Sequence, residues 1–245
     1  MIHVGPLMLT WHGLLTAMGI VVGVYAARPY ARRFGVDPEA LWALAPYVVL
    51  AGLVGGRLAY VGAHLAEFRS APLEVLRIDR GGLGSFGALI GALPAVYLFA
   101  RSRRLPPWRL ADVLAIAIPI NYLFMRAGNF LVGELYGDVT SVPWAVTFPG
   151  VVGPRHPVPI YDALAQVILI GLVIRRARAV PFEGFLFWWT LLSVSVIRFA
   201  MDLFRSEWKA VGALTLGQIG ALLPAATALA ILLFRGRRRT ETTTA

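Results

Sequence analysis

The polar stretch that follows the apolar run of residues 110–125 holds the residue types best suited to chemistry. Arg126 stands directly after that run, so its guanidinium must lie at or just inside the hydrocarbon boundary of a membrane. A charge at that depth is costly and usually serves a function. A guanidinium can bind two oxygens at once, which suits phosphate. Asn129 and Glu134 follow among glycines, in a pattern typical of a turn that presents amides and a carboxylate. The stretch from 126 to 137 therefore predicts an anion-binding site.

Further charged residues interrupt the other apolar runs, and arginine dominates among them. They are Arg57, Arg198, Arg205, Asp162 and Asp202. The surplus of positive charge is explained if an anionic ligand completes the site. Two alternatives stay open at this point. Arg57 and Arg205 can instead extend to lipid headgroups, and Arg198 with Asp202, four residues apart on one helical face, can form a structural ion pair.

The composition predicts an integral membrane protein. Of the 245 residues, 58% are hydrophobic and 15% charged, with a mean hydropathy of +0.70. Cysteine is absent, so this chain has no disulfide, thiolate metal site or cysteine nucleophile of its own. The net charge of +10 comes from short arginine clusters between apolar runs, with no basic domain. This pattern indicates membrane topology, and we expect neither a nucleic-acid partner nor a bound metal.

Seven runs are long enough to cross about 30 Å of hydrocarbon, which predicts an all-α polytopic membrane protein with seven transmembrane helices. They lie near residues 7–27, 40–63, 83–100, 109–128, 159–174, 183–203 and 214–234. Asp37, Pro38 and Glu39 supply a cap, a first-turn proline and a first-turn acid to the second helix. We expect one integral membrane domain over 1–245, with a small irregular outer-face cap at 138–158 and a disordered cytoplasmic tail at 235–245.

Glycine pairs at a spacing of four residues predict close helix packing. The pairs are Gly19 with Gly23, Gly52 with Gly56, and Gly87 with Gly91. Such small residues let membrane helices approach each other closely.

Arginines are concentrated in alternate connections between the predicted helices. The clusters are Arg28, Arg32 and Arg33, then Arg101, Arg103, Arg104 and Arg109, then Arg175, Arg176 and Arg178, then Arg235, Arg237, Arg238 and Arg239. Cytoplasmic loops carry such an excess of arginine and lysine. We therefore expect the amino terminus outside the membrane and the carboxyl terminus in the cytoplasm.

This orientation predicts that the unusual polar residues share the outer half of the membrane. Odd-numbered spans run inward and hold them early, whereas even-numbered spans run outward and hold them late. The residues are His12, Arg57, Gly81 to Gly87, Arg126 to Asn129, Tyr161, Asp162, Arg198, Asp202 and Arg205. We interpret them as one polar site that faces the outer surface.

The segment 126–137, Arg-Ala-Gly-Asn-Phe-Leu-Val-Gly-Glu-Leu-Tyr-Gly, resembles the signature of the prolipoprotein diacylglyceryl transferase family. These bacterial inner-membrane enzymes lipidate the lipobox cysteine of lipoprotein precursors. Supporting resemblances lie along most of the chain, at Trp11-His12-Gly13-Leu14, Gly56-Arg57-Leu58-Ala59-Tyr60, Gly81 to Gly91, Arg155-His156-Pro157 with Tyr161-Asp162, Arg198-Phe199 with Asp202 and Arg205, and Leu216-Gly217-Gln218. This ordered set is specific to the family.

The sequence departs from the family pattern at four positions. Phe86 stands where the family has a histidine, Val194 and His12 stand where it has tyrosines, and Val132 replaces an asparagine. The arginines and the Asn-Gly-Glu framework of the signature are intact. The departures leave the thiol-activating group open.

The resemblance implies transfer of the diacylglyceryl group of phosphatidylglycerol to a lipobox cysteine thiol, with release of glycerol phosphate and without a cofactor. Its implied partners are phosphatidylglycerol, lipobox-containing prolipoproteins and membrane lipids. We expect Arg126 and Arg198 to stabilise the departing phosphate. The residues expected to bind substrate are Arg126, Asn129, Glu134, Gly137, Arg57, Tyr60, Asp202 and Arg205.

His12 is the histidine inside a predicted outer-half helix, and we propose that it accepts the thiol proton. Alternatively, its ring only forms a hydrogen bond with a neighbouring helix or headgroup, as a tyrosine would.

Two other functions stay open on sequence grounds. An anion transporter would also need intramembrane arginines, but it should have polar access from both sides. A non-catalytic phospholipid-binding relative is the stronger alternative, because Phe86 removes an ionisable group from the expected site.

Overall fold

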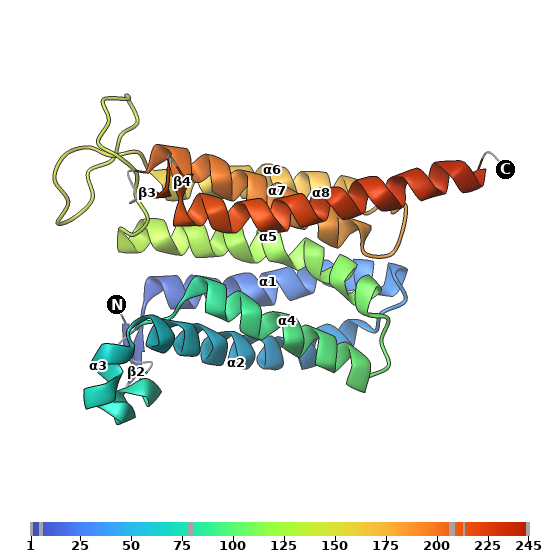
Figure 1. The fold of residues 1–245 in the computed structure, drawn as a ribbon, viewed down its shortest axis with the longest axis horizontal. Coiled ribbons are helices and arrows are strands. Elements are labelled where there is room, and N and C mark those ends of the chain that lie inside the picture. The colour runs from blue at the N-terminus through green and yellow to red at the C-terminus, as the bar shows by residue number, and fades with distance from the viewer. Residues whose placement is uncertain (1, 5–6, 78–80, 206–208, 213, 244–245) are drawn as a thin grey trace. The chain divides into compact units, whose positions relative to one another are not determined.

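Seven long helices form the described part of the chain, which in this computed structural model comprises residues 2–4, 7–77, 81–205, 209–212 and 214–243. They are α1 (Trp11–Arg33), α2 (Pro38–Ala63), α4 (Ser85–Ser102), α5 (Pro107–Val132), α6 (Val158–Arg176), α7 (Phe185–Met201) and α8 (Leu216–Thr243) (Figure 1). Six helical stretches are long and apolar enough to cross a membrane, and α4 supplies a shorter apolar helix. The predicted seven-helix membrane fold is confirmed.

The minor elements are short and lie before α1 or between the long helices. They are the strands β1 (Ile2–Val4), β2 (Leu7–Leu9), β3 (Lys209–Val211) and β4 (Leu214–Thr215), the helix α3 (Leu65–Ser70), and the 3₁₀ helices η1 (Pro72–Leu76) and η3 (Asp202–Phe204). Strands β1 and β2 pair with each other, as do β3 and β4.

Several boundaries differ from the sequence-based expectations. Helix α5 runs to Val132, so Asn129 lies in the helix and not in the expected turn. Residues 7–9 are a strand, so the first helix begins only at Trp11. Arg205 lies beyond α7 in an extended conformation, because the helix ends at Met201 and tightens into η3. The tail expected to be disordered is helical to Thr243, since a membrane-spanning helix already supplies the nucleus that further turns extend.

The chain divides into two compact units. One contains residues 9–30 and 111–245, and therefore most of α1 and α5 with α6, α7 and α8. The other contains residues 31–110, with α2, α3, η1 and α4. Each unit has its own packing, so we describe them separately.

In the second unit, α2 and α4 approach each other closely enough to exclude side chains between them. A Cβ atom added to Gly87 would collide with the carbonyl oxygen of Gly55 and with the Ala59 methyl group, and one added to Gly91 would collide with the carbonyl oxygen of Ala51. The amide of Gly84 donates to the carbonyl oxygen of Gly56 at 2.8 Å. The Gly87 and Gly91 pair therefore serves helix packing, as its spacing predicts.

The start of α2 also follows the sequence pattern. Asp37 Oδ1 accepts a hydrogen bond from the Glu39 amide at 3.0 Å, and Pro38 occupies the first turn. This cap satisfies one of the amides that a helix start leaves without an intrahelical partner.

In the first unit, α1 packs on one face of α5 through small residues. A Cβ atom on Gly19 would lie 2.8 Å from the Phe124 Cβ, and one on Gly128 would lie 2.8 Å from the His12 Cα. The α5 residues 117, 121, 124 and 128 thus face α1. Their spacing of three and four residues marks one side of the helix.

A buried carboxylate joins α5 to the start of α7. Asp112 accepts hydrogen bonds from the amides of Gly184 and Phe187, at 2.7 and 3.0 Å. Gly184 has a φ of 88°, so glycine suits the sharp turn into α7. Asp112 caps α7 from another helix, at the end of α7 away from Arg198.

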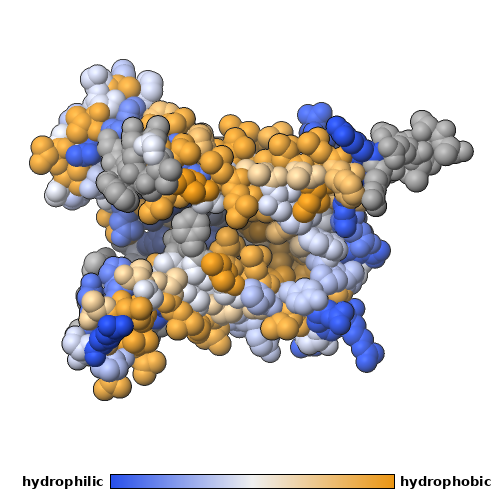
Figure 2. Space-filling model, viewed as in Figure 1, coloured by the Kyte–Doolittle hydropathy of each residue, from blue (hydrophilic) through white to orange (hydrophobic). Residues whose placement is uncertain are grey.

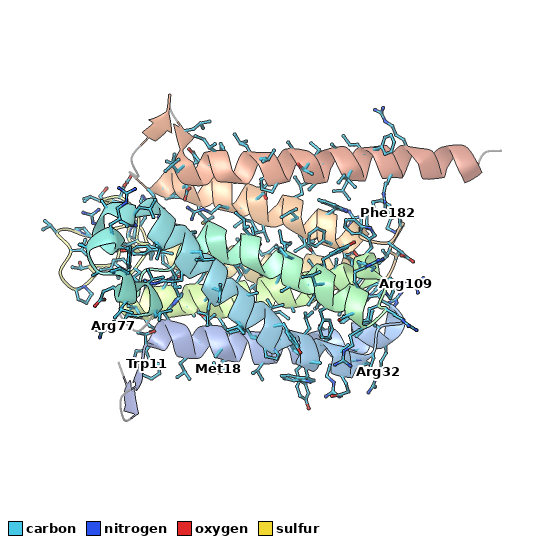
Figure 3. The ribbon with its side chains drawn as sticks, turned by 60° about the horizontal axis from the view of Figure 1, so that its bottom comes forward. Trp11, Met18, Arg32, Arg77, Arg109 and Phe182 are labelled. Atoms are coloured by element: carbon cyan, nitrogen blue, oxygen red, sulfur yellow. The ribbon has the colours of Figure 1, made fainter. Side chains whose placement is uncertain are left out.

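The sides of the helices are apolar and exposed, as a lipid-facing surface should be. Figure 2 shows hydrophobic residues along the helices and hydrophilic residues gathered mainly at helix ends. Along α1, Trp11 at the start and Met18 near the middle are both more than 40% exposed, and Arg32 marks the end (Figure 3). An aromatic residue at one end and arginine at the other fit the two interfaces of a bilayer.

Candidate functional site

The signature segment, residues 126–137, covers the last two turns of α5 and the double hydrogen-bonded turn that ends this helix. The amide of Gly133 donates to the Phe130 carbonyl at 3.1 Å, and the amide of Glu134 donates to the Asn129 carbonyl at 2.9 Å. This is a Schellman motif, with Gly133 at a φ of +77° in the left-handed position. The motif ends the helix at Val132, so Asn129 lies in its last turn and Arg126 one turn earlier. Both side chains therefore project from a rigid helix end.

Arg126 is held by side chains on three of its nitrogen atoms. Its Nε donates to Asp162 Oδ2 at 2.5 Å, its Nη1 to Asn129 Oδ1 at 3.1 Å and its Nη2 to the Tyr122 hydroxyl at 3.4 Å. The residue is only 6% exposed. A buried charge needs such a partner, and Asp162 on α6 supplies the opposite charge.

Both oxygens of Asp162 are engaged. While Oδ2 pairs with Arg126, Oδ1 accepts a hydrogen bond from Gln166 Nε2 at 2.9 Å. Gln166 lies one turn later on α6 and is fully buried. This second bond fixes the carboxylate plane and hence the direction of the Arg126 guanidinium.

Asn129 connects Arg126 to the signature turn. Its Nδ2 donates to Glu134 Oε2 at 3.4 Å while its Oδ1 accepts from Arg126. The predicted Asn129 and Glu134 therefore form one chain of hydrogen bonds with the arginine.

A second cluster centres on Asp202 at the end of α7. Asp202 Oδ1 lies 3.1 Å from Arg198 Nη2 and 3.6 Å from Arg205 Nη1, and its Oδ2 accepts from the Thr215 hydroxyl at 3.2 Å. Asp202 is buried, whereas the Arg198 side chain is 29% exposed. The ion pair predicted from the spacing of Arg198 and Asp202 is thus present, and Arg205 shares its carboxylate.

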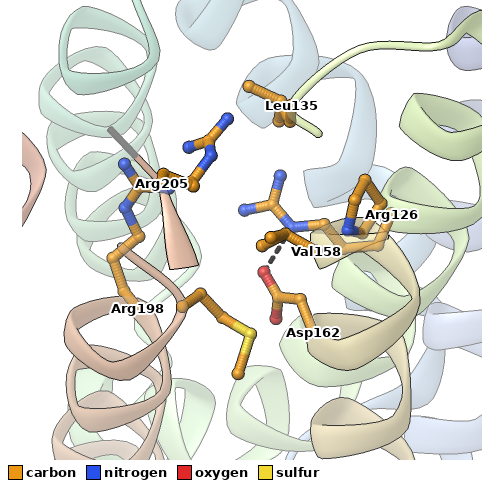
Figure 4. Close-up of a pocket in the computed structure, with 8 residues that line it drawn as sticks. Arg126, Leu135, Val158, Asp162, Arg198 and Arg205 are labelled. Carbon is orange, nitrogen blue, oxygen red and sulfur yellow. Dashed lines mark hydrogen bonds and ion pairs between the residues drawn. The ribbon is translucent and has the colours of Figure 1, made fainter. Parts of the chain in front are cut away.

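The two clusters line one small pocket. Its walls are formed by Arg126, Asp162, Arg198, Arg205, Leu135, Val158, Pro159 and Met201. Figure 4 shows the three guanidinium groups gathered around it, with Leu135 above Arg126 and Asp162 below. The lining contains three arginines and one aspartate, so the charge at the pocket wall is positive, which suits an anionic ligand.

Two glycines let the backbone approach these clusters. A Cβ atom on Gly217, in the first turn of α8, would collide with Asp202 Oδ2 and approach Arg198 Nη2. One on Gly137 would lie 2.5 Å from the carbonyl oxygen of Phe204 and 2.8 Å from atoms of His156 and Val158. The predicted Gly137 thus holds the signature segment against the neighbouring loop.

The irregular segment after Gly137 is confirmed and is anchored by bridges to Arg155. Val139 and Val146 each form an isolated β-bridge with that residue. Beside them, the Tyr161 hydroxyl accepts from Trp144 Nε1 at 2.7 Å and lies 3.1 Å from His156 Nδ1. The segment is therefore ordered by specific bonds, although it contains no long helix or strand.

Arg57 and Tyr60 lie in the other unit and have a different environment. Among the described residues, Arg57 donates to the backbone carbonyl oxygens of Val75, Glu74, Gly81 and Gly82, at 2.5 to 3.1 Å. Its Cζ also lies 5.7 Å from the centre of the Tyr60 ring. These contacts fasten α2 to η1 and to the glycine turn before α4.

His12 is in the first turn of α1. Its backbone packs directly against Gly128, on the side of α5 that faces α1. Gly128 and Arg126 are two residues apart, which separates their directions by about 200° around the helix. Within the described part of the chain, the His12 ring has no hydrogen-bond partner. Phe86 lies in the first turn of α4 and Val194 in α7.

Several residues that the sequence-based analysis did not single out contribute to the site. Tyr122 contacts Arg126, Gln166 orients Asp162, and Thr215 with Gln218 supports Asp202. Their positions one helical turn from a charged residue, or at a helix start, are the signals that could have identified them.

Comparisons with known proteins give one consistent result. The family model for prolipoprotein diacylglyceryl transferase matches residues 1–234. A phosphatidylglycerol–prolipoprotein diacylglyceryl transferase of Chromohalobacter salexigens is 34% identical, over 97% of this chain and 92% of the relative. Proteins of the same name from Rhodospirillum rubrum and Synechococcus elongatus are 33% and 30% identical, over 98% and 91% of this chain and 92% and 82% of the relatives.

Proposed function

Because the chain belongs to the prolipoprotein diacylglyceryl transferase family, we propose that it transfers the diacylglyceryl group of phosphatidylglycerol to the lipobox cysteine of lipoprotein precursors. The observation that carries the residue assignment is the pocket lined by Arg126, Arg198, Arg205 and Asp162. Its net positive charge matches the single negative charge of a phosphodiester headgroup.

In this reaction the substrate thiol loses its proton and its sulfur forms a bond to the glyceryl carbon. The bond between that carbon and the phosphate oxygen breaks, and its electron pair leaves with glycerol phosphate. Negative charge therefore grows on the phosphate as the reaction proceeds. Fixed guanidinium groups stabilise this transition state more than the bound substrate, which is the condition for acceleration.

We assign the phosphate contacts to Arg126 and Arg198. Arg126 is oriented by Asp162 and Asn129, and Arg198 by Asp202. Arg205 contributes charge beside them, and Glu134 with Gly137 holds the signature segment. Guanidinium suits this role because its planar fork meets two phosphate oxygens at once.

Arg57 and Tyr60 remain predicted headgroup residues. Four backbone carbonyls accept hydrogen bonds from Arg57, which supports a role in shaping the chain between α2 and α4. A direct contact with lipid would use its one further N–H group.

Thiol activation by His12 also stays a prediction. Its ring has no hydrogen-bond partner among the described residues, which supports a free proton-accepting nitrogen, whereas the packing of its backbone against Gly128 favours the alternative role of a packing residue. The His12→Tyr variant separates the two. An active single variant excludes His12 as the base, and activity restored only in the double variant His12→Tyr, Phe86→His supports it.

The protein is a multi-pass membrane protein, and we propose that it lies in the bacterial inner membrane with the pocket at the outer leaflet. The arginine-rich helix ends support a cytoplasmic carboxyl terminus and an external amino terminus. The outer leaflet would then present phosphatidylglycerol directly to the arginines.

The deciding experiment incubates the purified full-length protein with vesicles of phosphatidylglycerol and a lipobox peptide. Mass spectrometry should detect a peptide heavier by one diacylglyceryl group, and the product should disappear when phosphatidylcholine replaces phosphatidylglycerol. Headgroup binding without a modified peptide would instead identify a non-catalytic phospholipid-binding relative.

A further inference from the structure

Tyr122 lies one helical turn before Arg126, on the same face of α5. Its hydroxyl accepts a hydrogen bond from Arg126 Nη2 at 3.4 Å. The Arg126 Cζ also lies 4.8 Å from the centre of the tyrosine ring, within the range of a cation–π contact. The tyrosine therefore contacts the guanidinium through both its ring and its hydroxyl.

The hydrogen bonds of Arg126 leave part of its guanidinium available. A guanidinium has five N–H donors, one on Nε and two on each terminal nitrogen. Asp162, Asn129 and Tyr122 each accept one, from Nε, Nη1 and Nη2 in turn. Among the described residues these are the acceptors of Arg126, so one N–H remains on each of Nη1 and Nη2, and two such groups can meet two oxygens of one phosphate.

The Tyr122 hydroxyl has a proton of its own to donate. A phenol accepts and donates at once, and here the acceptor side faces Arg126. Within the described residues, no second partner takes the hydroxyl proton, and the side chain is only partly buried. An unused O–H group thus lies beside an arginine that has two unused N–H groups.

We propose that Tyr122 is a further headgroup-binding residue. Its ring holds the plane of the Arg126 guanidinium, and its hydroxyl donates a hydrogen bond to the same phosphate that Arg126 binds. This inference rests on the proposed function, since it assumes a phosphodiester at Arg126. As negative charge grows on the departing phosphate, the hydrogen bond from the phenol strengthens, so the hydroxyl should accelerate the reaction as well as bind the lipid.

Two substitutions separate the contributions of the ring and the hydroxyl. Tyr122→Phe keeps the ring against Arg126 and removes only the hydroxyl. Tyr122→Leu removes both. We expect kcat/KM for phosphatidylglycerol to fall about tenfold in the phenylalanine variant, mainly through kcat, and about 100-fold in the leucine variant.

The matched control is a second tyrosine and arginine pair on α1. The Arg28 Cζ lies 5.4 Å from the centre of the Tyr25 ring, and Tyr25 is exposed. Tyr25→Phe and Tyr25→Leu change the same side chain in the same kind of contact, away from the pocket. Both should keep the wild-type kcat and KM.

Inhibition by glycerol phosphate provides the measurement that a purely structural tyrosine would leave unchanged. Glycerol phosphate carries the phosphate without the acyl chains, so its inhibition constant should rise about tenfold in Tyr122→Phe. Wild-type kcat, KM and glycerol phosphate inhibition in Tyr122→Phe would overturn the proposal, whatever the leucine variant does. Failure of the proposed function has a different result, namely no peptide modification by the wild-type protein or full activity of Arg126→Lys.

Discussion

Arg57 and Arg126 are both buried arginines in membrane-spanning helices, but their partners differ in kind. Arg57 donates four hydrogen bonds to main-chain carbonyl oxygens of the segment 74–82. Arg126 donates three to the side chains of Asp162, Asn129 and Tyr122. The first arginine holds a loop, whereas the second is itself held by side chains of its own helix α5 and of α6.

The comparison contrasts an arginine that holds the backbone with the arginine that we propose to bind phosphate. Backbone carbonyl oxygens accept hydrogen bonds from nearly all the N–H groups of Arg57, so its guanidinium stabilises the local fold. Side chains orient Arg126 from two sides and leave one N–H on each terminal nitrogen. Burial and charge are alike in the two residues, and the identity of the acceptors separates them.

The largest loss of transfer activity is expected from substitutions of Arg126 and Arg198, whose guanidinium groups are oriented by side chains. Arg126→Lys and Arg198→Lys keep the charge but lose the fork that meets two phosphate oxygens, so transfer should fall at least about 100-fold, and about 1,000-fold in the alanine variants. Mass spectrometry of the lipobox peptide measures the effect. Arg101→Lys, an exposed arginine outside the pocket, should be fully active. Full activity of either pocket lysine variant would mean that generic positive charge suffices.

Arg57→Gln should affect stability before activity. The change removes hydrogen bonds to partly buried carbonyl oxygens, each worth roughly 0.5–1.5 kcal/mol, so the thermal unfolding midpoint should drop clearly. Arg69→Gln, at an exposed arginine of α3, is the control and should unfold like the wild type. Normal stability with weakened phosphatidylglycerol binding would make Arg57 a headgroup ligand and would remove the contrast with Arg126.

A smaller loss of stability is expected where α2 meets α4. Gly87→Val places a side chain against the Gly55 carbonyl and the Ala59 methyl group, which should cost about 1–3 kcal/mol. Gly62→Val introduces the same side chain on α2 at a position with nothing within 4 Å of the added Cβ. Comparable unfolding midpoints in the two variants would contradict the close approach of the helices that carry the Arg57 loop.

Single cysteine substitutions should leave activity and stability unchanged. Their labelling shows on which side of the membrane each substituted residue lies. The chain has no cysteine of its own, so each label reports one position. Ser141→Cys should react with an impermeant thiol reagent from outside, and Ser102→Cys only from inside. The reverse pattern would place the Arg126 pocket at the cytoplasmic leaflet.

Much of the fold follows from the sequence because its signals are local. Hydrophobic run length identified the seven helices, and Asp37 with Pro38 marked the start of α2. The end of α7 was misplaced because Leu203 and Phe204 are apolar and continue the pattern, while the chain tightens into η3 after Met201. Hydrophobicity does not distinguish the two backbone geometries.

The site was only partly predictable for a related reason. Arg126, Asp162 and Arg198 are visible because a charge in an apolar run is unusual. Tyr122 could not be identified in this way, because tyrosine is common in membrane helices. Only its contact with Arg126, four residues later, indicates a role in the site. The acceptors of Arg57 could not be identified either, because the direction of a carbonyl depends on the path of the loop and not on its side chains.

Leu135 determines the medium in which the arginines act. It has a φ of 57°, a conformation that is costly for a residue other than glycine, and yet it lines the pocket with Val158, Pro159 and Met201. An apolar wall lowers the local dielectric constant. At 4 Å, two unit charges attract by about 1 kcal/mol in bulk water and by about 4 kcal/mol at an effective dielectric constant of 20. In the function that we propose, Leu135 and the other three apolar residues would thus strengthen the attraction between each guanidinium and a phosphate without contributing any charge.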